Sequence, residues 1–322
     1  MSATARHYYN AATETMSADE LHVLQMDRLA GQLNYLVEHA PFYAEKFASV
    51  GAEPNDIRSP ADLARLPFTE KSELRQSQAE ESPVAGAVEE IGATLLPVGT
   101  GASDRLIASI QAMRATVLAT TPSHAIYLAE IARNDLGVEP AKLGIKNVMV
   151  GAEPGGGVPE IRARIESEWN ATCTESIGNV DVITIHSAEC EAQDGCHFMV
   201  PDYLLMEIIN PDSGSVIAPD QPELEGEMVF THLDRACNPM LRFRSRDHVV
   251  MKTSACACGR TGPRLKCVGW TDDMLILRGV NVWPSAIKDV VMSFRPEISG
   301  EMVISLDTPG PKVTPPLRIK VE

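Results

Sequence analysis

Residues 269–284, GWTDDMLILRGVNVWP, place two adjacent acids before a short apolar run, a Gly-Val-Asn-Val turn and a Trp-Pro pair. The apolar run predicts a strand, and a proline just after a turn is typical of the start of a helix. Residues 285–294, SAIKDVVMSF, then continue with helical spacing, and residues 301–306 and 317–321 are strand-like. The stretch therefore predicts a junction that leads into a small separate fold.

The composition describes an ordinary globular protein, with 322 residues, 44% apolar and 22% charged. The net charge is −16, from 28 basic and 44 acidic residues, so nucleic acid and anionic membranes are poor partners. The first residues contain no apolar signal region, and no apolar run is long enough to span a bilayer. The seven cysteines are an odd number, which favours a reducing compartment. We expect a cytoplasmic protein.

The periodicity changes along the chain. Residues 18–50 have helical spacing with a break at Ala40-Pro41, and the small, polar stretch 76–88 has the composition of a linker. From residue 92, strands and helices are expected to alternate. The expected strands are 93–98, 115–120, 146–151 and 170–176, and the expected helices are 103–113, 122–135 and 157–168. Such alternation predicts βαβ units and a parallel sheet.

After residue 180 the pattern becomes rich in strands and turns. We therefore predict an α/β fold in which a mostly parallel, doubly wound sheet carries an N-terminal helical arm, a β-rich subdomain and a truncated small C-terminal domain. The expected divisions are 1–90 for the arm and seam, 91–270 for the core and β-rich subdomain, and 271–322 for the C-terminal lid.

Several motifs, in order along most of the chain, resemble the phenylacetate-coenzyme A ligase branch of the adenylate-forming enzymes. They are APFYAEKF, ATTPSHAIYLAE, VGAEP, GEMVFTHLDRACNPMLRFRSRD, CACGRTGPR and WTDDMLILRGVNVWPSAIKDVV. The resemblance implies that the opening stretch is the swivel between a large and a small domain.

The resemblance also identifies inherited binding positions. The loop that flanks adenine in the family corresponds to Gly151, Ala152, Glu153 and Pro154, and the ribose-binding acid to Asp247. The family's Tyr-Gly-Leu-Ser-Glu segment aligns with residues 177–181, so that Gly178 is kept and Asp181 replaces the glutamate that holds magnesium. Trp270 stands where the family has an arginine on the ribose.

Two parts of the family pattern are missing from this sequence. The Ser/Thr/Gly-rich loop that cradles the ATP phosphates is not found, and the C-terminal catalytic lysine is not reached. Electrostatic stabilisation of the phosphates usually contributes most of the rate enhancement in such catalysis. On this basis we expect neither ATP nor Mg²⁺ to be used, although CoA stays a candidate ligand.

The first functional expectation is thus an ATP-independent enzyme built on a ligase scaffold. It would act on an aromatic or acyl (thio)ester by hydrolysis, acyl transfer or related acid–base chemistry. The alternatives are an ATP-dependent aryl-CoA ligase with unusual ATP contacts, and an inactive interaction subunit that binds a ligase or a carrier protein. We expect a homodimer in each case.

Histidines supply the candidate bases for the ATP-independent chemistry. His124 and His186 lie where the resembled family lines its acyl pocket, and Glu153 and Asp181 are acids near them in the expected fold. Each histidine is alternatively a packing or surface residue. The triple glycine 155–157 either binds an anion at a helix start or forms a turn.

Two pairs of metal-ligating residues occur far apart in the sequence. The set is Cys190, His197, Cys256 and Cys258. Sulfur and imidazole ligands in short turns are typical of tetrahedral zinc, and four protein ligands indicate a structural site. Cys196 or Cys267 is an alternative to one member of the set, and the competing interpretation is a group of reduced, unliganded thiols.

A triplet of arginines, Arg242, Arg244 and Arg246, alternates along an expected strand. Alternation places them on one face of a sheet. They either pair with neighbouring acids or hold a phosphate or carboxylate.

Overall fold

The computed structural model describes residues 8–70, 88, 90–98, 102–271, 275–277, 280–282, 284–292, 294, 297–298, 302–306, 312–313 and 316–322. The chain forms two compact units, and each combines two separate stretches of sequence. Unit 1 consists of Met1–Ala79 and Asn179–Lys266, and unit 2 of Glu80–Gly178 and Cys267–Glu322. Most of the expected linker 76–88, and Asp272, Asp273 and Arg278 of the swivel, lie outside the described residues.

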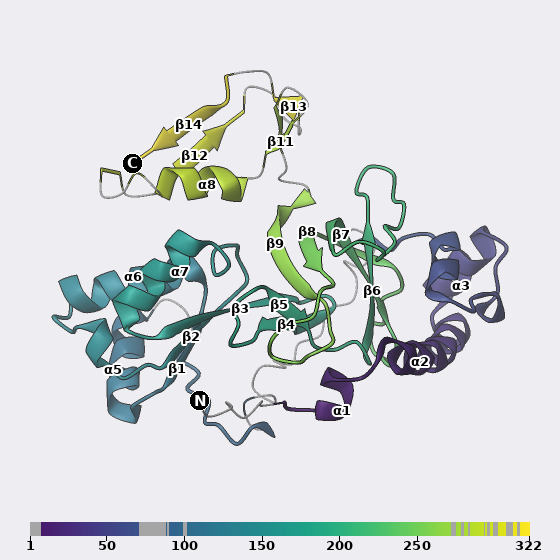
Figure 1. Cartoon of the computed structure of the whole chain (residues 1–322), viewed down its shortest axis with the longest axis horizontal. Coiled ribbons are helices and arrows are strands. Elements are labelled where there is room, and N and C mark those ends of the chain that lie inside the picture. Colours follow the sequence, from purple (N-terminus) through teal and green to yellow (C-terminus); the bar gives the residue numbers. More distant parts are fainter. Residues whose placement is uncertain are drawn as a thin grey trace. The chain divides into compact units, whose positions relative to one another are not determined.

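Unit 2 contains three parallel strands in the order β1 (Val117–Thr120), β2 (Asn147–Val150) and β3 (Thr172–Asn179). The helices α5 (Ser103–Met113), α6 (Pro122–Asn134) and α7 (Pro159–Trp169) lie beside the strands (Figure 1). A short 3₁₀ turn, η4 (Pro140–Lys142), precedes β2. Proline begins both α6 and α7, where its missing N–H has no helical partner. These are the predicted βαβ units.

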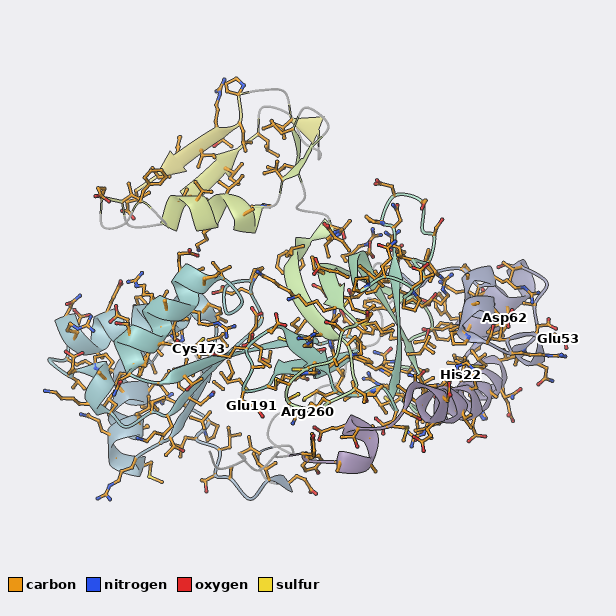
Figure 2. All side chains as sticks on the ribbon, in the orientation of Figure 1. His22, Glu53, Asp62, Cys173, Glu191 and Arg260 are labelled. Atoms are coloured by element: carbon orange, nitrogen blue, oxygen red, sulfur yellow. The ribbon has the colours of Figure 1, made fainter. Side chains whose placement is uncertain are left out.

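The core of unit 2 is almost purely apolar. Trp169 is fully buried, and its indole N–H donates to the carbonyl of Ala125 at 2.9 Å. Cys173, labelled in Figure 2, is also fully buried, on β3 opposite Val148. Burial of this apolar surface is the main force that holds helices and strands together here.

The C-terminal part of unit 2 begins with the opening stretch of the sequence. Strand β10 (Leu275–Leu277) pairs antiparallel with β11 (Val280–Val282) and parallel with β13 (Lys312–Val313). Helix α8 (Pro284–Met292) follows the Trp-Pro pair, and β12 (Met302–Ser305) pairs with β14 (Arg318–Val321). The predicted strand and helix are confirmed. Val-Asn-Val of the predicted Gly-Val-Asn-Val turn instead forms strand β11, and Gly279 lies outside the described residues.

Unit 1 begins with the predicted helical arm: α1 (Ala11–Glu14), α2 (Ala18–His39), α3 (Pro41–Ser49) and the 3₁₀ turns η1 (Pro54–Asp56) and η2 (Pro60–Arg65). A capping box starts α2, because Ser17 and Glu20 satisfy each other's backbone N–H groups. Its apolar face packs against a core that includes Leu205, Leu233 and Leu241.

The strands of unit 1 follow the order β4-β5-β9-β8-β7-β6. Their bounds are β4 Ile183–Glu189, β5 Cys196–Phe198, β6 Leu204–Ile209, β7 Glu223–His232, β8 Phe243–Lys252 and β9 Arg264–Trp270. The pairs β4–β5, β5–β9, β6–β7 and β7–β8 are antiparallel. This is the β-rich subdomain of the prediction, and the α/β fold class is confirmed.

One expected strand is wrong. Residues 93–98 have no strand pairing, and most of their side chains are exposed. Pro97 within the segment has no N–H to donate to a ladder. Within the part of the chain that the structure describes, no helix is long and apolar enough to cross a membrane.

Candidate functional site

Several predicted site residues gather at one edge of the parallel strands of unit 2. His124 lies in the first turn of α6, just after β1, and the loop 151–154 directly follows β2. Gly178 lies near the end of β3. Parallel strands bring their carboxyl ends to a common edge, which is where open α/β sheets bind ligands.

His124 is half-buried at this edge. Its Nδ1 and the Thr120 hydroxyl are 2.8 Å apart, and its ring stacks on Tyr127 with 6.0 Å between centroids. The backbone N–H of His124 donates to Thr121 Oγ1, which caps α6. The ring is thus held in one orientation.

Glu153 lies beside the same helix start. Its Oε1 accepts a hydrogen bond from the backbone N–H of Ser123 at 2.6 Å, so the carboxylate sits at the positive end of α6. Ala152 before it has φ +67°, a left-handed conformation that costs a non-glycine residue about 1 kcal/mol. The loop is therefore tied to α6 in a conformation that its sequence alone does not favour.

The triple glycine packs against a carboxylate of the protein itself. A Cβ on Gly157 would lie 2.7 Å from Glu175 Oε2, and one on Gly156 would lie 2.6 Å from Val150 Cγ2. Glu175 is buried in the middle of β3, opposite Val150, the last residue of β2. Glycine is required here because the loop backbone lies directly on this side chain.

His186 lies on β4 of unit 1, in the core. It is fully buried, its Nδ1 is 2.8 Å from Ser187 Oγ, and its ring packs against Phe198 and Phe230. Its Nε2 makes no hydrogen bond to any described residue. Burial lowers the pKa of His186 to about 4, so the imidazole is neutral at physiological pH.

The remaining inherited positions lie at strand ends and turns. Asp181 is half-buried in the turn before β4, and its N–H donates to Asn179 Oδ1 at 3.0 Å. Asp247 lies on β8 with 9% of its surface exposed. Trp270 ends β9 in unit 2 and is 50% exposed.

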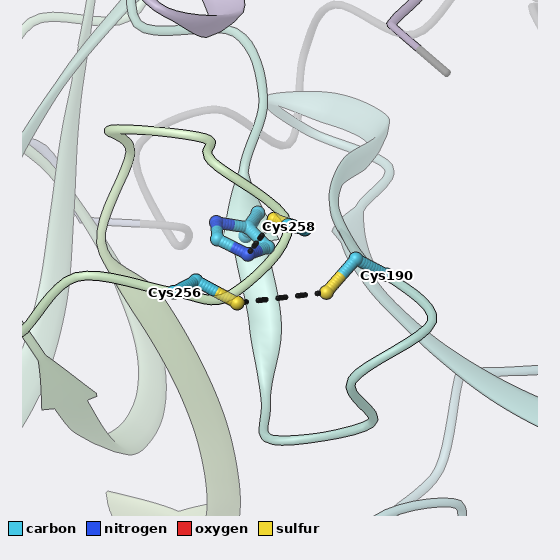
Figure 3. A group of neighbouring side chains, drawn as sticks. Cys190, Cys256 and Cys258 are labelled. Atoms are coloured by element: carbon cyan, nitrogen blue, oxygen red, sulfur yellow. Dashed lines mark hydrogen bonds between the residues drawn. The ribbon is translucent and has the colours of Figure 1, made fainter. Parts of the chain in front are cut away.

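The four predicted metal ligands come together in unit 1. The candidate ligand atoms of Cys190, His197, Cys256 and Cys258 all lie within 4.8 Å of one another. The sulfur atoms of Cys190 and Cys256 point toward each other at 3.7 Å, and Cys258 Sγ is 3.3 Å from His197 Nε2 (Figure 3). Cys196 and Cys267, the alternative ligands, are not in the group.

Strand pairing explains why the cluster forms. Strand β5 pairs with β4 on one side and β9 on the other, so His197 lies opposite Ala188 and Arg264. This places the turn after β4, which carries Cys190, beside the loop before β9, which carries the other two cysteines. The antiparallel sheet thereby brings together Cys190 and Cys256, which are 66 residues apart in the sequence.

The chemistry of the cluster fits zinc. The N–H at Nδ1 of His197 donates to the Gly262 carbonyl at 3.0 Å, which leaves the Nε2 lone pair facing the cysteines. Two sulfurs bound at 2.3 Å to a tetrahedral zinc lie about 3.8 Å apart, close to the observed spacing. Burial raises the pKa of the metal-free Cys190 thiol to about 12. The raised pKa means that the neutral thiol is favoured without metal. A bound cation favours the thiolate instead, because the thiolate is the form that binds metal.

The N-terminal segment binds to the loop that carries two of these cysteines. Arg260, labelled in Figure 2, pairs with Glu14 at 2.6 Å, and both side chains are largely buried. The Tyr8 hydroxyl donates to the Cys258 carbonyl at 2.9 Å, and Thr261 Oγ1 donates to the Met16 carbonyl at 2.8 Å. A mostly apolar cavity of about 420 Å³ lies between these segments and β5. No motif in the sequence indicated these contacts.

Comparison with known proteins identifies the family, although no family model matches the chain. The phenylacetate-coenzyme A ligase of Thermus thermophilus is 30% identical over 360 residues, which cover 90% of this chain and 79% of that ligase. The chain belongs to the phenylacetate-coenzyme A ligase family. The ligase of the same name from Aromatoleum evansii is 28% identical and covers 96% of this chain and 83% of its own length.

A solved structure agrees with this family. A 2-hydroxyisobutyryl-CoA ligase in the postadenylation state, in complex with R3-HIB-AMP, matches with a TM-score of 0.87 and 26% identity. The match covers 98% of this chain and 80% of that ligase. The adenylate-forming fold is therefore present over nearly the whole chain.

The expectation of an ATP-independent hydrolase or acyltransferase is wrong. The relatives are acid–thiol ligases, and the matching structure holds an acyl-adenylate. These relatives also count against the expectation that ATP is not used, because the matching structure holds an AMP derivative. The alignment with the Thermus ligase is longer than the 322-residue chain, so that ligase has residues in the matched region that this chain lacks. The prediction gave these missing residues more weight than the retained fold and motifs.

Proposed function

We propose that the chain is an ATP-dependent ligase that joins an aryl or small acyl carboxylic acid to coenzyme A. The observation that carries this proposal is the match, over 98% of the chain, to a CoA ligase in complex with an acyl-adenylate. The identity of 30% to a phenylacetate-coenzyme A ligase supports the same reaction.

The reaction has two balanced steps. In the first, a carboxylate oxygen of the acid attacks the α-phosphorus of ATP, an acyl–O–P bond forms, and the α–β phosphoanhydride bond breaks to release pyrophosphate. In the second, the CoA thiolate attacks the acyl carbon, a thioester forms, and AMP leaves. Both steps develop negative charge on oxygen, so fixed dipoles and cations lower their barriers.

Residues at the carboxyl edge of β1–β3 supply the acid and adenine contacts in this proposal. His124, held by Thr120, faces the acyl group, and the loop 151–154 flanks adenine. The bond from Ser123 to Glu153 keeps that loop on α6. A rigid edge of this kind keeps bound reactants in one orientation, which is the usual source of much of the rate enhancement in two-substrate reactions.

Within unit 1, considered by itself, the proposal assigns nucleotide contacts to two acids. Asp247 accepts hydrogen bonds from the ribose hydroxyls, and Asp181 offers a carboxylate to magnesium. A hard oxygen donor fits that cation, which is held by one or two carboxylates together with phosphate oxygens. When bound with ATP, magnesium neutralises phosphate charge.

Acid-dependent exchange of labelled pyrophosphate into ATP tests the proposal. The panel contains arylacetic, arylcarboxylic and short hydroxy acids. We expect exchange with at least one acid, AMP release when CoA is added, and a loss of about 100-fold in Asp247→Asn. A wild-type protein that catalyses no exchange with the whole panel overturns the ligase proposal.

We also propose that the Cys/His cluster binds one structural zinc ion. The observation is the set of four ligand atoms within 4.8 Å, with His197 oriented by the Gly262 carbonyl. We expect one zinc per chain by mass spectrometry of the purified protein, and none in Cys256→Ser. Cys237→Ser, at an exposed cysteine outside the cluster, is the matched control and keeps its zinc. A wild-type protein without zinc after growth in zinc-supplemented medium contradicts the proposal.

A homodimer, a carrier-protein partner and a cytoplasmic location stay predictions. Among these, the oligomeric state is the simplest to measure, by light scattering during size-exclusion chromatography.

A further inference from the structure

Strand β8 contains a bulge just before its midpoint. On β7 only Met228 lies between Glu227 and Val229, whereas on β8 three residues, 245–247, lie between the partners of those two. Arg246, at the centre of the bulge, has φ +66°. Bulges re-aim side chains, and a left-handed arginine persists only where its surroundings hold it. Asp247 is the last residue of this bulge.

One set of contacts fixes the bulge from within. Ser245 Oγ donates to the Met228 carbonyl and accepts from the backbone N–H of Asp247, each at 3.1 Å. These bonds join the bulge to β7. They do not involve the Arg246 side chain, which extends away to a different segment.

That segment consists of residues 66–70, called here the clamp. Its backbone joins the start of β8: the N–H of Thr69 donates to the Arg242 carbonyl at 3.0 Å, and the N–H of Arg244 donates to the Thr69 carbonyl at 3.1 Å. The Phe68 ring lies 4.2 Å from the Arg242 guanidinium, which is itself buried and paired with Glu207. The clamp is therefore anchored on a rigid part of unit 1.

Glu70 ends the clamp and reaches the bulge. Its Oε2 accepts from Arg246 at 2.6 Å, and its Oε1 lies 3.9 Å from Arg244. One carboxylate thus faces two of the three arginines that precede Asp247 in sequence. The pair with Arg246 is about one-third exposed, 32% and 35% for the two side chains, so its role is orientation more than global stability.

We propose that Glu70, acting through Arg246, is a positioning residue that holds the β8 bulge so that the Asp247 carboxylate faces the nucleotide ribose. The inference rests on the proposed ligase function. It assigns a role in nucleotide binding to Glu70, which is 177 positions away from Asp247 in the sequence. The partner of Glu70, Arg246, directly precedes Asp247. Without the Glu70 carboxylate, Arg246 loses its 2.6 Å ion pair with the clamp, the left-handed turn is held less firmly, and the Asp247 carboxylate samples other directions more often.

The test compares Glu70→Gln with Asp202→Asn, which removes the charge from a matched ion pair. The pair Arg28–Asp202 has 34% and 32% exposed side chains and lies outside the clamp and the bulge. In pyrophosphate exchange, we expect Glu70→Gln to raise KM for ATP about fivefold, with KM for the acid unchanged. We expect Asp202→Asn to leave both values at the wild-type level.

A second readout does not depend on activity. Amide hydrogen exchange at Asp247, whose N–H is bonded within the bulge, is expected to accelerate about fivefold in Glu70→Gln and not in Asp202→Asn. Unchanged exchange at Asp247 in Glu70→Gln overturns the inference, whatever the enzyme assay gives. A wild-type protein without pyrophosphate exchange overturns the ligase proposal alone, and the amide measurement still decides the positioning role.

Discussion

The two units bury different kinds of side chain. In unit 2 the buried polar residues among those described are Glu175 and Ser176, in the middle of β3 where its pairing with β2 ends. In unit 1 they are far more numerous: Gln32, Thr69, His186, Ser187, His197, Glu207, Glu227, Thr231, His232, Arg242, Asp247, His248 and Arg264. Unit 2 is thus held by apolar packing, and unit 1 by packing together with a polar network.

The difference shows how each unit selects its strand register. A buried charge without its partner costs several kcal/mol. Each buried ion pair in unit 1 therefore disfavours every strand register that would separate its two side chains. Arg242 and Glu207 form one such pair, and Arg244 with Glu227 forms another. In unit 2 the register follows from apolar alternation and helix packing, and the two buried polar groups lie at the site edge, where a ligand is expected.

The strongest test of this comparison breaks the Arg242–Glu207 pair. Both side chains are at most 5% exposed, so Arg242→Met leaves a buried carboxylate without its cation. We expect a loss of about 3–5 kcal/mol in the free energy of unfolding, measured with urea. The double variant Arg242→Met with Glu207→Gln is expected to recover at least half of it. If both variants lose the same amount, packing rather than the charge pair holds this part of unit 1.

A smaller effect is expected from acid. Burial lowers the pKa of His186 to about 4, against 6.5 for an ordinary histidine, so the unfolded chain binds this proton first as pH falls. Stability is therefore expected to fall between pH 6.5 and pH 4, by about 3 kcal/mol from this residue. His186→Phe should reduce the slope of unfolding free energy against pH over this window. His22→Gln, at an exposed position on α2 (Figure 2), is the control substitution. An unaltered slope in His186→Phe contradicts the assignment.

The smallest effect is expected in the apolar core of unit 2. Ile165 on α7 is fully buried among apolar neighbours. Ile165→Val removes one methylene and should cost about 1 kcal/mol, equally at pH 7 and pH 5. Urea titrations at the two pH values measure this. A cost that depends on pH would mean that unit 2 contains a buried titratable group coupled to its core.

The same contrast explains which parts of the fold the sequence predicted. Helices such as 122–135 and the strands 115–120 and 146–151 were expected at nearly their observed bounds, because apolar periodicity drives unit 2. The error at 93–98 came from an apolar run with no partner strand. Local hydrophobicity predicts a strand only if the rest of the fold supplies an edge for it.

The candidate sites were predictable to different degrees. All four residues of the Cys/His cluster were predicted from the sequence, because ligand type and turn spacing are local signals. The expected pairing of the three arginines with acids is confirmed, but alternation on one face is not the reason. Arg242 precedes β8 with φ +47°, and Arg246 lies in the bulge with φ +66°. Their partners come from three separate segments, and contacts of this range have no signature in a single sequence.

The interleaving of the two units has a consequence for synthesis on the ribosome. The apolar core of unit 2 lies between Ile107 and Cys173, so one continuous stretch can collapse as soon as it emerges. Unit 1 has no such freedom, because Tyr8 and Glu14 bind residues near 258–261 that are made some 250 positions later. The segment around Tyr8 and Glu14 is thus made well before its binding partners. The apolar face of α2, which packs against Leu205, Leu233 and Leu241, needs protection from aggregation until those residues are made.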